Sequence, residues 1–240
     1  MAIVTTRVAE RPREYVAVRG RDAEDFLQRM VSNDVTSGDV VDALLLTAKG
    51  RLIAPLRIWR RGDDDFLLGT EPGLGAAVLS TLARARFAAK VELAPEEHAA
   101  VLVWTDDFAD AQETLDSDLE PNVDDAERAR IAAGVPAWGK ELDASILPAE
   151  AGLDATHISF SKGCYPGQEP IVRLRHRGHV NRRLRVLEVA AAQPGDEIAY
   201  GAKVVGRVTS AAPGVALGYV RVDVPDDAEL RIGGRTARLH

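Results

Sequence analysis

The C-terminal part of the chain has the pattern that most restricts its fold. After Arg182, short apolar runs alternate with turns rich in glycine and proline. The runs are Leu184–Val189, Glu197–Tyr200, Val204–Thr209, Ala216–Val222 and Leu230–Ile232. Short strands separated by regular turns are typical of a small all-β barrel. We therefore predict that the chain ends in a β-barrel that contains these five runs as strands.

The residues before Arg182 mix helical and strand patterns, so the whole chain is predicted to be α+β. Apolar spacing predicts a helix over Arg21–Val31, which Asp22 can cap, and a second helix after Pro72. Strands are predicted at Leu44–Thr47, Leu52–Trp59, Phe66–Leu68, Val91–Leu93 and Ala99–Trp104, a short helix at Phe108–Leu115, a loop at 116–125 and an irregular segment at 135–153. Pro55 lacks a ladder donor, so it is expected on a sheet edge or at a bulge. We divide the chain into residues 1–172 and a barrel of residues 173–240.

Composition narrows the cellular setting. The chain is 46% hydrophobic and 28% charged, as in soluble globular proteins. It has no run of about 18 apolar residues, and Met1–Arg13 lacks the apolar core of a signal peptide. A single cysteine argues against an exported domain built on disulfides. We expect a cytoplasmic protein without a membrane partner, and the net charge of -7 opposes stable binding of nucleic acid.

The one cysteine, Cys164, lies in Lys162-Gly163-Cys164-Tyr165-Pro166-Gly167-Gln168-Glu169. A lone thiol acts either as a small buried apolar group or as a reactive sulfur. Lys162 and a helix that begins near Pro166 would both favour the thiolate, so we favour a reactive Cys164 with Lys162 beside it. Gly163 and Gly167 allow backbone conformations that are closed to other residues.

A basic cluster follows this motif. Arg173, Arg175, Arg177, Arg182, Arg183 and Arg185 occur in a stretch with His176 and His179 and without an acid. Arginine pairs well with carboxylates, but an acidic protein or an RNA phosphate would fit equally, and a solvated surface is as good an explanation. His176 and His179 lack companion ligands, so no metal site is predicted.

The cysteine octapeptide resembles the signature of the YgfZ-type folate-binding proteins. These are relatives of the glycine cleavage T-protein, an aminomethyltransferase, and are linked to iron–sulfur cluster maintenance. Weaker similarities occur in the family's order at 20–35, 47–51, 130–136, 139–141 and 148–153. The resemblance implies a T-protein-like ring of lobes around a central cavity that takes tetrahydrofolate or another reduced folate. It also implies iron–sulfur enzymes or cluster assembly proteins as partners.

The resemblance suggests roles for several further residues. Gln168 and Glu169 offer an amide and a carboxylate that match the donor–acceptor edge of a pterin, although Glu169 could instead cap a helix. Arg173 and Arg175 are candidates for the carboxylates of folate. Arg130, Glu141 and Glu150 are further candidate contacts, and for the two glutamates a solvated loop is the alternative.

The sequence also departs from the T-protein. Ala54 and Pro55 occupy the positions of its paired aspartates, and neither can exchange a proton. This argues against aminomethyl transfer and leaves enzymatic activity open. The main hypothesis is a tetrahydrofolate-binding protein that supports assembly or repair of iron–sulfur clusters. The alternatives are a folate-dependent one-carbon transferase or demethylase and a non-catalytic scaffold.

Overall fold

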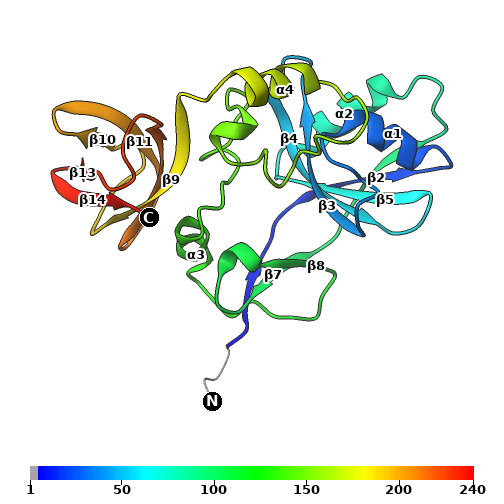
Figure 1. Cartoon of the computed structure of the whole chain (residues 1–240). Helices are drawn as coiled ribbons and strands as arrows, with labels where there is room; N and C mark the ends of the chain where they lie inside the picture. The colour runs from blue at the N-terminus through cyan, green and yellow to red at the C-terminus, as the bar shows by residue number, and fades with distance from the viewer. Residues whose placement is uncertain (1–4) are drawn as a thin grey trace.

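A computed structural model describes residues 5–240, so part of the Met1–Arg13 segment considered above lies outside the described residues. The described chain forms a five-stranded sheet, a three-stranded sheet and a closed six-stranded barrel. Figure 1 shows the barrel on one side, the five-stranded sheet on the other, and the small sheet below them. No helix among the described residues is long and apolar enough to cross a membrane.

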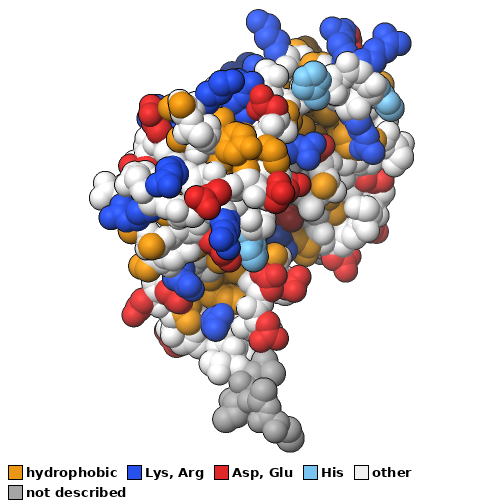
Figure 2. Space-filling view, turned by 60° about the vertical axis from the view of Figure 1, so that its left-hand side comes forward, with side chains coloured by type: hydrophobic (Ala, Val, Ile, Leu, Met, Phe, Trp, Pro, Cys, Tyr) orange, Lys and Arg blue, Asp and Glu red, His pale blue; other side chains and the backbone are white. Residues whose placement is uncertain are grey.

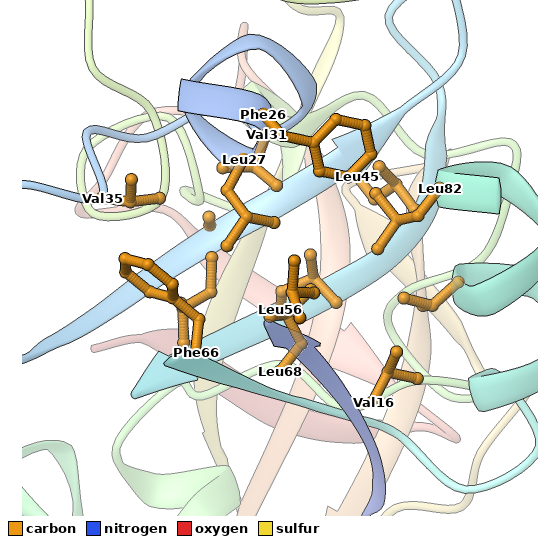
Figure 3. Packing of buried hydrophobic residues seen from close by; sticks show 14 of the residues in the cluster. Val16, Phe26, Leu27, Val31, Val35, Leu45, Leu56, Phe66, Leu68 and Leu82 are labelled. Carbon is orange, nitrogen blue, oxygen red and sulfur yellow. The ribbon is translucent and has the colours of Figure 1, made fainter. Parts of the chain in front are cut away.

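The five-stranded sheet has the order β3-β4-β5-β2-β6 and carries the largest core. Its strands are β2 (Glu14–Arg19), β3 (Val40–Leu46), β4 (Leu52–Arg60), β5 (Asp65–Thr70) and β6 (Glu92–Glu96), and helices α1 (Ala23–Met30) and α2 (Gly75–Ala85) pack against it. Leu27 of α1 and Leu82 of α2 are fully buried against Leu45 and Leu68 of the sheet (Figure 3). Each such leucine contributes roughly 1.5–3 kcal/mol of burial free energy.

The small sheet has the order β1-β7-β8. It consists of β1 (Arg7–Glu10), β7 (Ala100–Trp104) and β8 (Gln112–Leu115), with the 3₁₀ turn η1 (Phe108–Asp110) between the last two. Helix α3 (Ala126–Ala132) and a long irregular segment with the 3₁₀ turn η2 (Pro148–Glu150) follow. These elements carry the chain from the small sheet toward α4 (Gln168–Arg177), which lies at the top of the view in Figure 1.

The barrel contains the five predicted strands and a sixth. Its strands are β9 (Arg182–Val189), β10 (Glu197–Tyr200), β11 (Lys203–Ala212), β12 (Val215–Arg221), β13 (Glu229–Ile232) and β14 (Arg235–Leu239). They close in the order β10-β11-β12-β9-β14-β13, and closure leaves no unpaired edge. The sequence pattern missed β14 because Ala237 is its only fully buried residue.

Two local predictions were wrong, and a third, for Pro55, holds only locally. The helix predicted at Phe108–Leu115 is limited to η1, and Gln112–Leu115 instead pairs with β7. Asp22 precedes α1 but makes no side-chain cap, because its carboxylate accepts the Lys90 N–H at 2.7 Å. Strand β4 is an inner strand, but Pro55 lies just beyond its ladder with β5, which ends where Thr70 pairs with Leu56, and close to a bulge in the ladder with β3 between Leu52 and Ala54.

Candidate ligand cavity and cysteine loop

A cavity of about 970 Å³ lies between the two sheets, the irregular segment and the start of β9. Its wall includes charged side chains from distant parts of the sequence, among them Arg57, Arg130, Glu150 and His157. Pro55, Leu56 and Arg57 of β4 all line it, and Pro55 and Arg57 do so from the same face, because alternate residues of a strand share a face. Sequence reasoning considered Pro55 but missed Arg57. The alternation of strand residues could have indicated that Arg57, two positions further, shares the face of Pro55.

The cavity wall holds a dense group of ion pairs around Glu113. The Glu113 side chain is only 2% exposed and accepts hydrogen bonds from Arg13 at 2.6 and 2.8 Å. Arg57 pairs with Asp42 at 3.2 Å, whereas its buried Nε atom makes no hydrogen bond among the described residues and has the Glu113 carboxylate 3.9 Å away. Buried donors normally have a hydrogen-bond partner, so the unsatisfied Nε donor of Arg57 is unusual. We call it the orphaned donor, and it belongs to a side chain that lines the cavity.

His157 is a second group on this wall that the sequence interpretation assigned no ligand role. Burial lowers the pKa of its imidazole; Asp42 opposes that shift, and Arg57 and Arg13 add to it. Burial therefore favours the uncharged form of the ring. Its Nδ1 atom lies 2.7 Å from the Thr156 hydroxyl. The wall thus combines guanidinium donors with an imidazole.

The cavity suits a folate in size and chemistry. Small-molecule pockets usually have volumes of about 300–1,000 Å³ and a few well-placed polar groups. A reduced folate carries the ring and carboxylate acceptors that the orphaned Arg57 Nε requires. When bound, tetrahydrofolate would supply a carrier for one-carbon groups. The residues described here could hold and orient it.

Two of the predicted folate contacts, Arg130 and Glu141, lie in a buried hydrogen-bond network that joins the first part of the chain to the barrel. Arg130 donates to Glu141 at 2.9 Å and to the Ser210 hydroxyl of β11, also at 2.9 Å. Ser210 and the Ala137 N–H each donate to a Glu141 oxygen. The Tyr219 hydroxyl of β12 donates to the Glu141 carbonyl at 2.8 Å. Both carboxylate oxygens of Glu141 are therefore engaged, while Arg130 also lines the cavity.

Glu150 lies on the cavity wall and is engaged with neighbouring groups. One carboxylate oxygen accepts from Arg182 at 2.9 Å and the other from the Leu147 N–H at 3.0 Å. The Arg182 guanidinium also packs over the Tyr219 ring, 4.8 Å from its centroid. This arrangement ties η2 to β9 of the barrel and fixes the wall of the cavity between them.

The cysteine loop, residues 162–167, contributes no residue to the lining of this cavity. Cys164 is exposed, as a reactive thiol requires. The Lys162 ammonium donates to the carbonyl oxygens of Val31, at 2.9 Å, and Asn33, at 2.6 Å. Burial lowers the pKa of Lys162 to about 8, and nearby Asp34 partly opposes the shift. Lys162 thus anchors the loop to the segment after α1.

Only one of the two glycines beside Cys164 needs to be glycine. Gly167 has φ +86°, and a Cβ atom there would lie 2.5 Å from the Thr47 carbonyl oxygen in the β3–β4 turn. Gly163 has an ordinary φ, and a Cβ atom there would meet nothing within 4 Å. The absence of a side chain at Gly167 thus allows the cysteine loop to pack closely on the β3–β4 turn.

Helix α4 begins at Gln168, directly after the cysteine loop. Glu169 and Arg173 form an exposed ion pair one turn apart at 2.5 Å, and neither residue lines the main cavity or the second pocket described below. Arg175 lies over the Phe160 ring, 3.7 Å from its centroid, and lines a second pocket of about 280 Å³. Figure 2 shows Lys, Arg and His side chains gathered at the top of the molecule, where α4 lies in Figure 1. No group of three or more His, Cys, Asp or Glu residues within 5–240 is arranged to hold a metal ion.

The comparison with solved structures defines the class of fold. The structure matches the glycine cleavage system aminomethyltransferase T of Bartonella henselae with a TM-score of 0.83, over 99% of this chain and 85% of that one. The sequences are 18% identical, so the likeness concerns the fold. The protein thus has the T-protein-like α+β fold, followed by a six-stranded barrel.

Sequence comparisons show which known proteins the chain is similar to. Residues 172–240 match the family model of the CAF17 C-terminal β-barrel domain. The iron-sulfur cluster assembly factor IBA57 homolog of Neurospora crassa is 25% identical over 72% of this chain and 51% of its own length. The tRNA-modifying protein YgfZ of Cronobacter sakazakii is 28% identical over 75% of this chain and 71% of its own length. The chain is thus similar to proteins of the YgfZ/IBA57/CAF17 family over about three quarters of its length, and it spans about half the length of the fungal relatives it matches.

Proposed function

We propose that this protein binds a reduced folate and supports the assembly or repair of iron–sulfur clusters in other proteins. The observation that carries the proposal is the cavity of about 970 Å³ lined by Arg57, whose Nε donor has no hydrogen-bond partner among the described residues. Relatives named as iron–sulfur cluster assembly factors support the cluster role. Iron–sulfur enzymes or their assembly proteins would be the partners.

Within this proposal the cavity and the thiol have separate tasks. Arg57 and His157 would bind and orient the pterin end of the folate from the cavity wall. Gln168, Glu169 and Arg173 remain candidate contacts at the start of α4, and Arg175 remains a candidate contact for a carboxylate. Cys164 is exposed on the outer loop, so it would act on a partner protein rather than on the folate in the cavity. One thiol cannot hold a cluster by itself, so the partner would supply the other ligands.

Calorimetric titration with tetrahydrofolate tests the folate part. We expect wild-type protein to bind, and Arg57→Gln to bind about 10–100 times more weakly, because the variant loses charge-assisted hydrogen bonds. Arg29→Ala, which alters an exposed ion pair on α1, is the control and should bind as the wild type does. Failure of the wild-type protein to bind any reduced folate would contradict the proposal.

The thiol part is tested in cells that depend on this chain for iron–sulfur enzyme activity. We expect Cys164→Ala to lower that activity under oxidative stress. Ser161→Ala changes an exposed residue in the same loop and should leave the activity intact. Equal activity of Cys164→Ala and wild type would remove the thiol from the mechanism.

A second candidate function is a folate-dependent one-carbon transferase. The observation in its favour is His157 on the cavity wall, because burial favours the uncharged imidazole, which could accept the proton that Ala54 and Pro55 cannot. Turnover of a methylated amine by purified protein with tetrahydrofolate, and its loss in His157→Gln, would support this function. No turnover across a panel of methylated amines would count against it.

A further inference from the structure

The second pocket, of about 280 Å³, differs in charge from the main cavity. Three cationic side chains line it, Lys49 from the β3–β4 turn, Arg175 from α4 and Arg183 from β9, together with His179. Asp154 is the one acid among its lining residues. No ion pair joins any of the three cations to a carboxylate within residues 5–240. In the main cavity, by contrast, Arg11, Arg13 and Arg57 are matched with carboxylates.

One of these cations, Arg175, is also held in place by its neighbours in the pocket. The Arg175 guanidinium lies over the Phe160 ring, and Leu147, Ile171 and Leu174 supply an apolar wall. Stacking on an aromatic ring fixes the plane of a guanidinium, so less conformational entropy is lost when it binds a carboxylate. An apolar wall with a fixed cation suits a ligand that has a methylene chain and an anionic end.

The two cavities are neighbours. Ala149, Asp154 and Arg183 line both of them. A ligand in the main cavity could therefore extend a flexible, anionic end past these residues toward Lys49 and Arg175. The glutamate end of a folate has this chemistry, since each added γ-linked glutamate brings methylenes and one more carboxylate.

We propose that the second pocket binds the glutamate chain of the folate, and that the protein therefore prefers folates with several glutamates. This inference rests on the proposed binding of a reduced folate in the main cavity. Lys49 and Arg175 would each meet a carboxylate at a site that is partly open to solvent. Two such contacts give a preference of about tenfold for the triglutamate over the monoglutamate at low salt. Screening by added salt reduces this preference.

Titration with tetrahydrofolate monoglutamate and triglutamate, at two salt concentrations, tests the inference. In the wild type, the triglutamate should bind about tenfold more tightly, and the ratio should shrink as salt increases. In Lys49→Gln/Arg175→Gln, the ratio should fall to about one. Arg177→Ala removes a cation of α4 that lines neither cavity, so it should retain the wild-type ratio. Lys49→Gln alone alters only the β3–β4 turn and should show an intermediate ratio even if the double variant is unstable.

The outcomes separate this inference from the proposed function. Equal affinity of the wild type for both folates would overturn the role of the second pocket and leave folate binding in the main cavity standing. A preference that persists in Lys49→Gln and in the double variant would also overturn it. Absence of binding with either folate would overturn the proposed function itself.

Discussion

The Lys162 Nζ atom lies 2.6 Å from the Asn33 carbonyl oxygen, so a hydrogen bond joins the cysteine loop to the segment after α1 across 129 residues of sequence. A second bond from the same ammonium reaches the Val31 carbonyl oxygen at 2.9 Å. Sequence reasoning assigned Lys162 to the activation of Cys164. The structure shows its ammonium bound to two carbonyl groups, and thus gives it a part in positioning the loop.

Replacing Lys162 by methionine should destabilise the protein. Methionine keeps an unbranched apolar stem of similar length but removes both hydrogen bonds, and hydrogen bonds from charged donors contribute about 1.5–3 kcal/mol each before the cost of burying the charge. We expect a net loss of about 2 kcal/mol, measured by urea unfolding at pH 7. Lys49→Met, at an exposed turn, is the matched control and should change little. An unchanged unfolding midpoint in Lys162→Met would show that the two bonds do not stabilise the fold.

The lowered pKa of Lys162 also predicts how stability depends on pH. In the folded protein the ammonium titrates near pH 8, whereas the unfolded chain releases this proton near 10.5. Between these values the unfolded state holds more protons at this site, so its contribution to stability rises with pH. The free energy of unfolding of the wild type should therefore increase relative to that of Lys162→Met from pH 8 to about 9.5. Parallel pH profiles for the two proteins would contradict the shift.

Gly167 and Gly163 provide a matched pair of substitutions around the thiol. Gly167→Ala places a Cβ atom 2.5 Å from the Thr47 carbonyl oxygen at φ +86°, which neither the turn nor the loop can accept without moving. We expect this variant to lose about 2 kcal/mol or more in urea unfolding. Gly163→Ala meets nothing within 4 Å and should be tolerated. Equal stability of the two variants would contradict the close packing of the loop on the β3–β4 turn.

The sequence predicted the elements whose burial follows a simple period. The five barrel runs, the helix predicted at Arg21–Val31 and the strand predicted at Leu52–Trp59 all have regular apolar spacing, and all are present. It failed where contacts between distant segments decide the structure. Gln112–Leu115 is a strand because β7 offers it a partner, and β14 is held by closure of the barrel although its own pattern is weak.

The candidate site shows the same difference between features that local sequence can predict and features that depend on contacts between distant segments. The octapeptide indicated the family and an exposed Cys164, both of which local sequence can specify. It could not indicate that Glu141 and Arg130 face the barrel, because their partner Ser210 lies 80 residues beyond Arg130. Arg57 and Glu113 escaped notice for a related reason. They meet only when the two sheets come together.

The buried Arg130–Glu141 pair should hold the first part of the chain against the barrel, because both residues form hydrogen bonds with Ser210 of β11. Glu141→Gln would remove the fully buried opposite charge from the Arg130 guanidinium and leave it only the ion pair with the half-exposed Glu127, and the loss of one partner of a buried pair costs about 3–5 kcal/mol. Because glutamine retains some hydrogen bonds, we expect a loss of about 3 kcal/mol by urea unfolding. Glu169→Gln makes the same chemical change in an exposed helical pair and should cost about 0.2–0.5 kcal/mol. Similar losses in both variants would show that the buried pair does not fasten the barrel.

The exposure of Cys164 predicts a thiol that reacts without unfolding. The sulfur belongs to an exposed residue in a loop that Lys162 and Gly167 hold in place. A disulfide reagent such as DTNB should therefore modify one thiol per folded chain, at a rate within about tenfold of that in urea. Because the reaction does not depend on unfolding, a urea concentration below the unfolding transition should leave this rate nearly unchanged. Cys164→Ser, which removes the only thiol, should show no reaction and retain the wild-type unfolding midpoint. A native rate that rises in step with the unfolded fraction would mean that the sulfur is covered, and the thiol could then not act on a partner from the folded state.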